Sequence, residues 1–357
     1  MSFTDQPAAH EGNIPYINDH YLADEAKLVG ELAAAADSGE AARKKIGRTA
    51  AQLVTAVRNN TAKESGIEAF LQQYDLSSDE GVLLMCIAEA LLRIPDADTA
   101  DRLIADKITS AKWKDHIGVS DSIFVNASTW GLMLTGQILS AGDLGTSNPG
   151  QALSRLVSRI GEPVVRTAMR QAMKIMGHQF VMGRTIAEAL KRSLKNEKLP
   201  YRYSFDMLGE SALTSADAQR YLENYHEGID SIGKGPQIDA PDVFSAPGIS
   251  VKLSALHPRY EYTHEERVLK ELVPEILELA KHAKKVGIGL TIDSEEASRL
   301  EMWLNIFERV YRDRALDGGE GFGLAVQTYQ KRGRDTMRFV EDLAGQVGRR
   351  IPVRLVK

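Results

Sequence analysis

After residue 200 the sequence alternates between short runs of apolar or β-branched residues and longer segments with helical spacing. This alternation is typical of βαβ units, which build a parallel sheet covered by helices. Five strands are predicted, at residues 203–208, 248–253, 288–293, 322–327 and 351–357. Helices are predicted between them, from about residues 215, 263, 297 and 335, and Thr263 and Glu266 are expected to form a capping box at the start of the second helix.

About five strand–helix steps resemble the first part of a (β/α)8 barrel, because a whole barrel needs roughly 250 residues. The predicted fold class is therefore α/β, with an all-α N-terminal region followed by an incomplete (β/α)8 barrel. We predict an N-terminal arm at residues 1–45, a helical domain at 46–199 and the first part of the barrel at 200–357.

The segment before residue 200 has apolar residues at helical spacing and almost no strand pattern. A capping box at residues 77–80 precedes one apolar helix, and a long helix is predicted from Pro163 to about Leu194. The single cysteine, Cys86, lies in an apolar run, which favours a buried thiol over a nucleophile. One cysteine cannot form an internal disulfide, which fits a reducing cytoplasm.

Composition gives no reason to expect a nucleic-acid partner, since the formal net charge is -5. The N-terminus lacks the pattern of a secretory signal, and no apolar run reaches the roughly 18 residues of a membrane span. The eight histidines and one cysteine form no motif with metal-ligand spacing. We therefore expect a cytoplasmic protein without a metal site.

Charged or amide side chains lie at or near the end of every predicted strand, where barrel enzymes have their active sites. They are Asp206 and Glu210, Lys252, Asp293, Gln327, and Arg354 with Lys357. Lys252 interrupts an otherwise apolar strand, and burying an unpaired charge is very costly. Asp293, at the tip of a neighbouring strand, is its predicted partner. An ion pair that merely closes the barrel mouth is the alternative interpretation.

Several of these segments resemble motifs of the bifunctional bacterial proline utilisation A family. The segment ISVKLSALHPRY, residues 249–260, is similar to the lysine-bearing strand of that family. The other similar segments are FDMLGE at 205–210, IDSEEASRL at 292–300, VQTYQKR at 326–332, VRLVK at 353–357 and the run at 80–92. The similarity extends over nearly the whole chain after about residue 15.

The resemblance implies a proline dehydrogenase that oxidises L-proline to pyrroline-5-carboxylate at FAD, in the catabolism of proline to glutamate. A second activity, an NAD-dependent L-glutamate-γ-semialdehyde dehydrogenase, would lie in a region absent from this chain. The electron acceptor would be a quinone at the membrane surface, reached by a cytoplasmic protein that binds peripherally to the inner face of the membrane.

The same resemblance implies roles for substrate-binding residues. Lys252 would help to hold the proline carboxylate, and Asp293 would support that lysine and the flavin edge. Glu210 resembles a gating carboxylate that pairs with a substrate-binding arginine. The arginines that clamp the substrate would lie beyond Lys357, so this chain alone is expected to be inactive.

Four residues besides Asp293 would form the flavin site by resemblance. Gln327 would contact the flavin ring, and Arg354 would lie near the flavin N5 that accepts hydride. Val356 and Lys357 would complete the cofactor-binding strand. A cation near the isoalloxazine stabilises reduced anionic flavin, which agrees with the placement of Arg354.

Two other functions are open on the residues alone. Lys252 or Lys357 beside Asp293 would suit a Schiff-base aldolase. The second alternative is a non-catalytic helical interaction module joined to a decayed barrel. Some members of the family begin with a DNA-binding domain, but the N-terminus here is not basic, and no repressor role is predicted. Homo-oligomerisation through the N-terminal arm and regions absent from this chain is a further hypothesis.

Overall fold

The computed structural model of the chain describes residues 16–61, 99, 181–194, 201–235 and 241–357. The chain divides into two compact units. One consists of residues 1–37 with 185–357, and the other of residues 38–184, which include α2 (Gly39–Thr61). The predicted capping box at residues 77–80, Cys86 and the start of the predicted helix at 163–194 lie outside the described residues.

The unit that contains residues 185–357 is built on a five-stranded parallel sheet. Its strands are β1 (Ser204–Asp206), β2 (Gly248–Val251), β3 (Gly289–Ile292), β4 (Phe322–Gln327) and β5 (Val353–Val356). Their order in the sheet is their order in the sequence. The register aligns Val251 with Ile292 and Leu324 with Val353. Because all pairs are parallel, the carboxyl ends of the strands meet at one edge, and the five predicted strands are confirmed.

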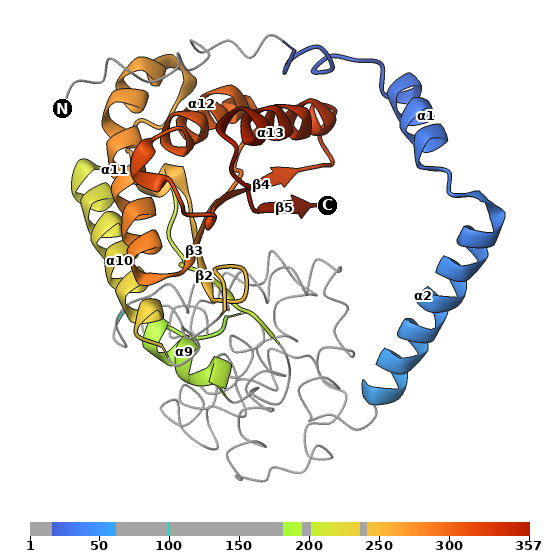
Figure 1. The fold of residues 1–357 in the computed structure, drawn as a ribbon, viewed down its shortest axis with the longest axis horizontal. Helices are drawn as coiled ribbons and strands as arrows, with labels where there is room; N and C mark the ends of the chain where they lie inside the picture. Colours follow the sequence, from blue (N-terminus) through green and yellow to red (C-terminus); the bar gives the residue numbers. More distant parts are fainter. Residues whose placement is uncertain (1–15, 62–98, 100–180, 195–200, 236–240) are drawn as a thin grey trace, which may run out of the picture. The chain divides into compact units, whose positions relative to one another are not determined.

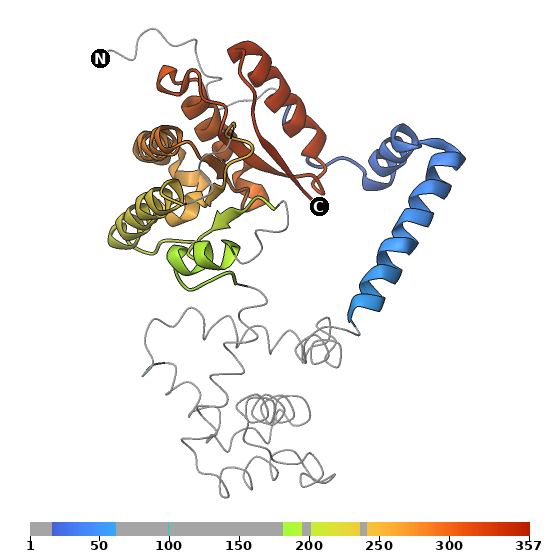
Figure 2. The same ribbon diagram turned by 60° about the horizontal axis from the view of Figure 1, so that its bottom comes forward.

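Four helices follow the first four strands and cover the outside of the sheet (Figure 1, Figure 2). They are α10 (Ser215–Gly233), α11 (Glu265–Val286), α12 (Leu300–Tyr311) and α13 (Gly333–Val347). The unit is therefore a curled parallel half-barrel of βα steps. This arrangement confirms the predicted α/β class and the incomplete barrel.

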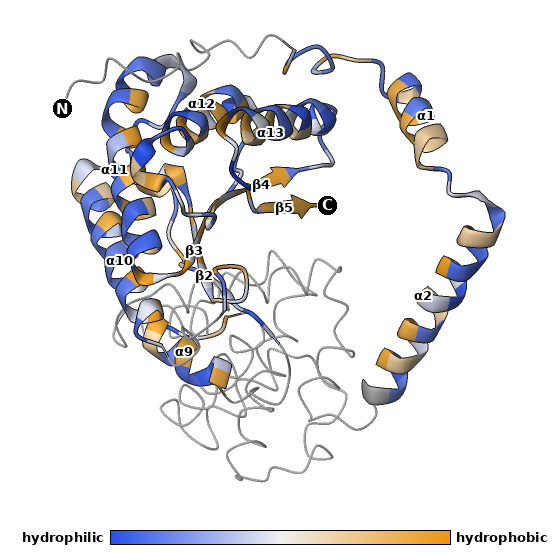
Figure 3. Cartoon of the chain, in the orientation of Figure 1, coloured by the Kyte–Doolittle hydropathy of each residue, from blue (hydrophilic) through white to orange (hydrophobic). Residues whose placement is uncertain are grey.

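The sequence of α11 explains why this helix buries one face. Its buried residues recur three or four positions apart, at Val268, Leu272, Ile276, Leu279, Ala280 and Ala283. This spacing places them on one stripe of the helix, while charged residues occupy the other side (Figure 3). The helix ends at Val286, and its C-cap Gly287 has a φ of 80°, which a residue without a Cβ readily adopts. The helix packs against β3, whose Leu290 and Ile292 are buried.

The predicted start of α11 is wrong. The helix is capped by His264, without a side-chain hydrogen bond, and a 3-10 turn (Tyr262–His264) leads into it. The Thr263 hydroxyl lies 3.0 Å from Nδ1 of His264. Thr263 thus lies before the N-cap and does not form the reciprocal bonds of a capping box with Glu266.

The helix predicted from 163 to 194 is not continuous at its C-terminal end. Residues 181–185 are not helical, and a new helix, α9, spans Ile186–Ser193. Thr185 adopts an extended conformation with φ of -134°, and its hydroxyl accepts a hydrogen bond from the Glu188 amide at 3.2 Å. A threonine in this role begins a helix, so the apolar spacing alone misled the prediction.

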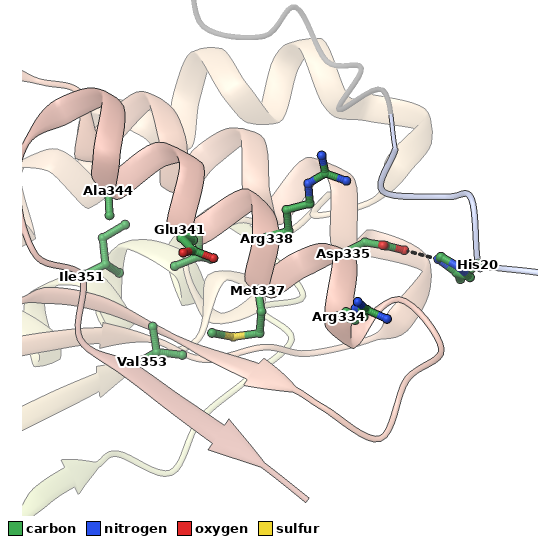
Figure 4. Close-up of a pocket in the computed structure, with 10 residues that line it drawn as sticks. His20, Arg334, Asp335, Met337, Arg338, Glu341, Ala344, Ile351 and Val353 are labelled. Atoms are coloured by element: carbon green, nitrogen blue, oxygen red, sulfur yellow. Dashed lines mark hydrogen bonds and ion pairs between the residues drawn. The ribbon is translucent and has the colours of Figure 1, made fainter. Parts of the chain in front are cut away.

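The N-terminal segment before α1 (Glu25–Ala36) lies against the barrel helices. Ile17 is fully buried, and the Tyr16 hydroxyl donates to Asp342 at 3.0 Å. His20 lies 2.8 Å from Asp335 near the start of α13, beside a cavity of about 790 Å³ that α13 and β5 line (Figure 4). The predicted boundary at residue 45 lies inside α2, and the three predicted segments remain a prediction.

Candidate active site

Lys252 stands directly after β2, and its ammonium group is held by two carboxylates. Its Nζ lies 2.9 and 3.0 Å from the two oxygens of Asp206 and 3.1 Å from Oδ2 of Asp293. The Lys252 and Asp293 side chains are only 19% and 15% exposed, whereas that of Asp206 is 51% exposed. The predicted pairing of Lys252 with Asp293 is thus present. Asp206, which ends β1, is a second partner that the strand-end pattern named without assigning it this contact.

The surroundings of Lys252 keep its side chain charged. Burial alone would lower its pKa, but hydrogen bonds and charge interactions with Asp206 and Asp293 outweigh burial and raise the pKa above the ordinary value of 10.5. The backbone amide of Lys252 donates to the buried Tyr225 hydroxyl at 3.1 Å. The site therefore presents a protonated ammonium group whose backbone is also fixed.

Arg354 on β5 reaches across the inner face of the sheet. Its guanidinium donates to the Ser204 hydroxyl on β1 at 2.8 Å and to the Ser250 hydroxyl on β2 at 3.1 Å. It also lies 3.4 Å from Oδ1 of Asp293. Asp293 therefore links the two cations of the site, Lys252 and Arg354.

Sequence reasoning missed the two serines that hold Arg354. A detectable signal existed, because Ser204 and Ser250 each precede a predicted site residue, Asp206 and Lys252, by two positions. Side chains two positions apart on a strand point to the same face. Small polar residues at these positions on adjacent strands indicate a polar inner face next to the carboxyl ends.

Gln327, at the end of β4, joins two loops. Its side-chain amide donates to the carbonyls of Ser294 at 3.2 Å and Glu295 at 2.9 Å, in the loop after Asp293. Gln330 in turn donates to the Gln327 side-chain oxygen. The position of Gln327 is thus set by backbone groups of the neighbouring loop.

The remaining predicted site residues are less closely connected. The Val356 carbonyl accepts hydrogen bonds from the Thr328 amide at 2.9 Å and the Thr328 hydroxyl at 2.8 Å. Glu210 and Lys357 are exposed and form no hydrogen bond or ion pair with the described part of the chain. The structure therefore brings together Lys252, Asp293 and Arg354 but leaves these two side chains apart from them.

The described residues contain no group of three or more His, Cys, Asp or Glu side chains arranged to hold a metal ion. None of their helices has both the length and the apolar character that a membrane crossing requires.

Three family models match consecutive parts of the chain. Residues 16–58 match the proline utilization A proline dehydrogenase N-terminal domain, residues 66–180 the DNA-binding domain of proline dehydrogenase, and residues 189–357 proline dehydrogenase. The chain belongs to the proline utilization A family. Its half-barrel, with Lys252, Asp293 and Arg354, is part of the proline dehydrogenase domain.

Individual relatives agree with this assignment. The chain is 46% identical to bifunctional protein PutA of Salmonella typhimurium over 87% of this chain and 23% of the relative. It is 42% identical to bifunctional protein PutA of Escherichia coli over 100% of this chain and 27% of the relative. A crystal structure of a Bradyrhizobium japonicum proline utilization A mutant is 44% identical, with a TM-score of 0.63, covering 94% of this chain and 32% of that one. The chain thus spans about a quarter of the length of these curated relatives.

The model matched by residues 66–180 is described as a DNA-binding domain. Nearly all of these residues lie outside the described part of the chain. The expectation that the protein has no nucleic-acid partner therefore remains a prediction.

Proposed function

We propose that this chain carries part of the active site of a FAD-dependent proline dehydrogenase, which oxidises L-proline to pyrroline-5-carboxylate in proline catabolism. The observation that carries the proposal is the cluster of Lys252, Asp293 and Arg354 at the carboxyl ends of strands in a proline dehydrogenase domain. Barrel enzymes have their active sites at this edge.

Lys252 is suited to bind the carboxylate of proline. Its ammonium group is protonated, fixed in position and only partly exposed, so a charge-assisted hydrogen bond to a carboxylate would be strong. A substrate carboxylate would compete for Nζ more readily with Asp206, which is 51% exposed, than with Asp293, which is 15% exposed. In this proposal Asp293 remains in place and orients the lysine.

The residues around Arg354 fit a flavin. Three hydrogen-bond contacts, to Ser204, Ser250 and Asp293, use part of the guanidinium, which has five N–H donors. The side chain is 42% exposed, so a fixed cation with spare donors faces the site. Such a cation stabilises negative charge on a reduced isoalloxazine. When bound, FAD would supply the two-electron acceptor that oxidation of the proline C–N bond requires.

The other cofactor contacts rest on likeness to the family. Gln327, Val356 and Lys357 are proposed to line the flavin together with Asp293 and Arg354. The bonds from Gln327 to the loop after Asp293 support this, because they hold its amide at the same edge of the sheet as Asp293. Glu210 is proposed as a gating carboxylate at that edge.

The charge state of Lys252 argues against the Schiff-base alternative. Imine formation needs a deprotonated amine, which enzymes obtain by lowering the lysine pKa. The carboxylates around Lys252 raise its pKa instead. The geometry therefore favours carboxylate binding over aldolase chemistry.

Features of the whole protein are also part of the proposal. The relatives named bifunctional support a second, NAD-dependent semialdehyde dehydrogenase activity outside this chain. A quinone at the inner face of the cytoplasmic membrane is proposed as the electron acceptor. Homo-oligomerisation is proposed to involve the N-terminal arm.

The proposal is tested with the purified full-length protein. We expect bound FAD and reduction of a quinone-like dye that depends on L-proline. A flavin-loaded protein that reduces no dye with proline would contradict the proposal. Trapping of a carbonyl substrate by borohydride at Lys252, without bound flavin, would favour the aldolase alternative.

A further inference from the structure

The loop between β1 and α10 has an unusual backbone. Ser211 has a φ of 54°, and it is the one non-glycine residue with positive φ in the described part of the chain. Gly209 has a φ of 142°, and a Cβ at this position would lie 2.5 Å from the Tyr221 ring. A serine rarely adopts a left-handed conformation unless its surroundings enforce it. Other contacts must therefore hold this loop in place.

Ser254 supplies these contacts. The Ser211 amide donates to the Ser254 hydroxyl at 3.0 Å, and the Ala212 amide donates to the Ser254 carbonyl at 2.9 Å. Ser254 is only 3% exposed and stands two residues after Lys252. One buried serine thus binds two consecutive amides of the strained loop.

Ser254 is itself held by Glu295. One carboxylate oxygen of Glu295 accepts the Ser254 amide at 3.0 Å, and the other accepts the Ser254 hydroxyl proton. The hydroxyl therefore donates to Glu295 while it accepts from Ser211. Glu295 stands two residues after Asp293, and its carbonyl accepts the Gln327 amide at 2.9 Å. Glu295 and Ser254 thus connect Gln327, at the end of β4, to the loop after β1.

Glu210 lies between the two residues with positive φ. Its side chain is exposed and has no hydrogen-bond or ion-pair partner among the described residues. The position of its carboxylate therefore depends on the backbone at Gly209 and Ser211. Of these two, Ser211 is held by Ser254.

We propose that Ser254 is a positioning residue for substrate binding. Together with Glu295 it holds the loop of residues 209–212 in its strained conformation, and so sets the backbone position from which the Glu210 side chain projects at the carboxyl ends of the strands. This inference rests on the proposed function, because it assigns the loop to the mouth of a proline site. Ser254 itself is too buried to be the substrate contact.

The first test measures hydrogen–deuterium exchange of the full-length protein without added substrate. Ser254→Ala removes the hydroxyl bonds to Ser211 and Glu295, so exchange of amides in residues 209–213 should become about tenfold faster. Ser193→Ala is the matched control, because Ser193 is also 3% exposed and its hydroxyl donates one bond, to the Leu190 carbonyl at 2.8 Å. It should leave this loop unchanged.

Adding Ser211→Gly to Ser254→Ala separates positioning from packing. Glycine adopts a φ of 54° without strain, so the loop conformation should depend less on the Ser254 hydroxyl. Much of the protection of the loop amides against exchange should therefore return. If Ser254→Ala does not fold, Ser254→Cys keeps the size and a weak donor, and intermediate exchange is expected. Unchanged exchange in either Ser254 variant would overturn the inference, as would a double variant without recovery.

The second test measures proline kinetics of the flavin-loaded full-length protein. Ser254→Ala should raise KM for L-proline about 3- to 10-fold and change kcat less than about twofold, and Ser193→Ala should change neither. Faster loop exchange with unchanged KM would overturn the positioning role. If the unmodified protein binds no flavin or oxidises no proline, the proposed function fails, whereas the exchange experiment still reports on the bonds of Ser254.

Discussion

The guanidinium of Arg354 on β5 donates a hydrogen bond of 2.8 Å to the hydroxyl of Ser204 on β1, although these strands stand at opposite ends of the five-stranded sheet. Five strands about 4.8 Å apart would separate the two residues by roughly 19 Å in a flat sheet. Even a long side chain could not span that distance. The bond therefore depends on the curl of the sheet, which directs the side chains of both edge strands toward one centre.

Lys252→Met should weaken proline binding while FAD stays bound. The change removes one charge-assisted contact, worth about 1.5–3 kcal/mol, so kcat/KM for proline should fall roughly 10- to 150-fold. Steady-state kinetics and flavin content of the full-length protein measure both effects. Lys281→Met is the control, because its ion pair with Glu278 lies at the surface of α11. If the kinetics of Lys252→Met were unaltered, the alternative interpretation would be favoured, in which Lys252 forms an ion pair that only closes the barrel mouth.

The two carboxylates around Lys252 should respond differently to substitution. Asp293→Asn removes the less exposed partner and a contact of Arg354, so KM for proline should rise and stability should fall by about 1–3 kcal/mol. Asp206→Asn affects a half-exposed carboxylate, and stability should change by less than about 1 kcal/mol. The KM of Asp206→Asn for proline should stay constant or fall, because the proline carboxylate then competes with a neutral amide for the Lys252 ammonium group. A rise in KM for Asp206→Asn as large as for Asp293→Asn would contradict this assignment.

Stability should decrease as the pH falls below 6.5 because of His226. Burial, with a contribution from His282, lowers the pKa of His226 below its ordinary value of 6.5. The unfolded state therefore binds a proton at a higher pH than the folded state, and stability is lost between 6.5 and the lowered pKa. Asp230 lies 2.8 Å from His282, and the pKa of Asp230 is lowered from 3.8, so its effect belongs to a more acidic range.

Urea unfolding at several pH values measures this dependence. His226→Gln should make the unfolding free energy depend less steeply on pH just below 6.5, because it removes the group that titrates there. A slope that is identical in both proteins would show that His226 does not cause it.

Arg332 should be important for docking of the N-terminal segment. It is 4% exposed, donates to Asn18 at 2.8 Å and to the Ala297 carbonyl, and stacks 4.4 Å from the Tyr21 ring. Arg332→Met should cost about 1–3 kcal/mol of unfolding free energy, because Asn18 and the Ala297 carbonyl lose their donors. The exposed Arg334 provides the control, and Arg334→Met should cost less than about 0.5 kcal/mol. Equal losses in the two variants would show that the segment does not depend on Arg332.

The strands were predictable because their apolar runs are separated by helical segments of clear period. Helix starts were harder to predict. At Thr263 the residue types of a capping box are present, but the hydroxyl contacts the His264 ring, a contact that sequence spacing does not specify. At Thr185 the opposite error occurred, since an apolar period continued through a residue that in fact caps a new helix.

The pairing of Lys252 with Asp293 was predictable because a charge inside an apolar strand needs a partner at the same edge. The contacts of Arg354 were not, because they depend on how strongly the sheet curls. No local pattern relates Ser204 to a residue 150 positions later. The strained backbone at Ser211 was equally hidden, since serine carries no sequence signal for positive φ.

The most direct test of the proposed proline site is the anaerobic addition of L-proline to the flavin-loaded full-length protein, with the flavin absorbance as the readout. We predict that L-proline bleaches the oxidised flavin band, and that Lys252→Met needs a roughly 10- to 150-fold higher proline concentration for half of the effect. A protein with stoichiometric FAD whose absorbance does not change with L-proline would contradict the account.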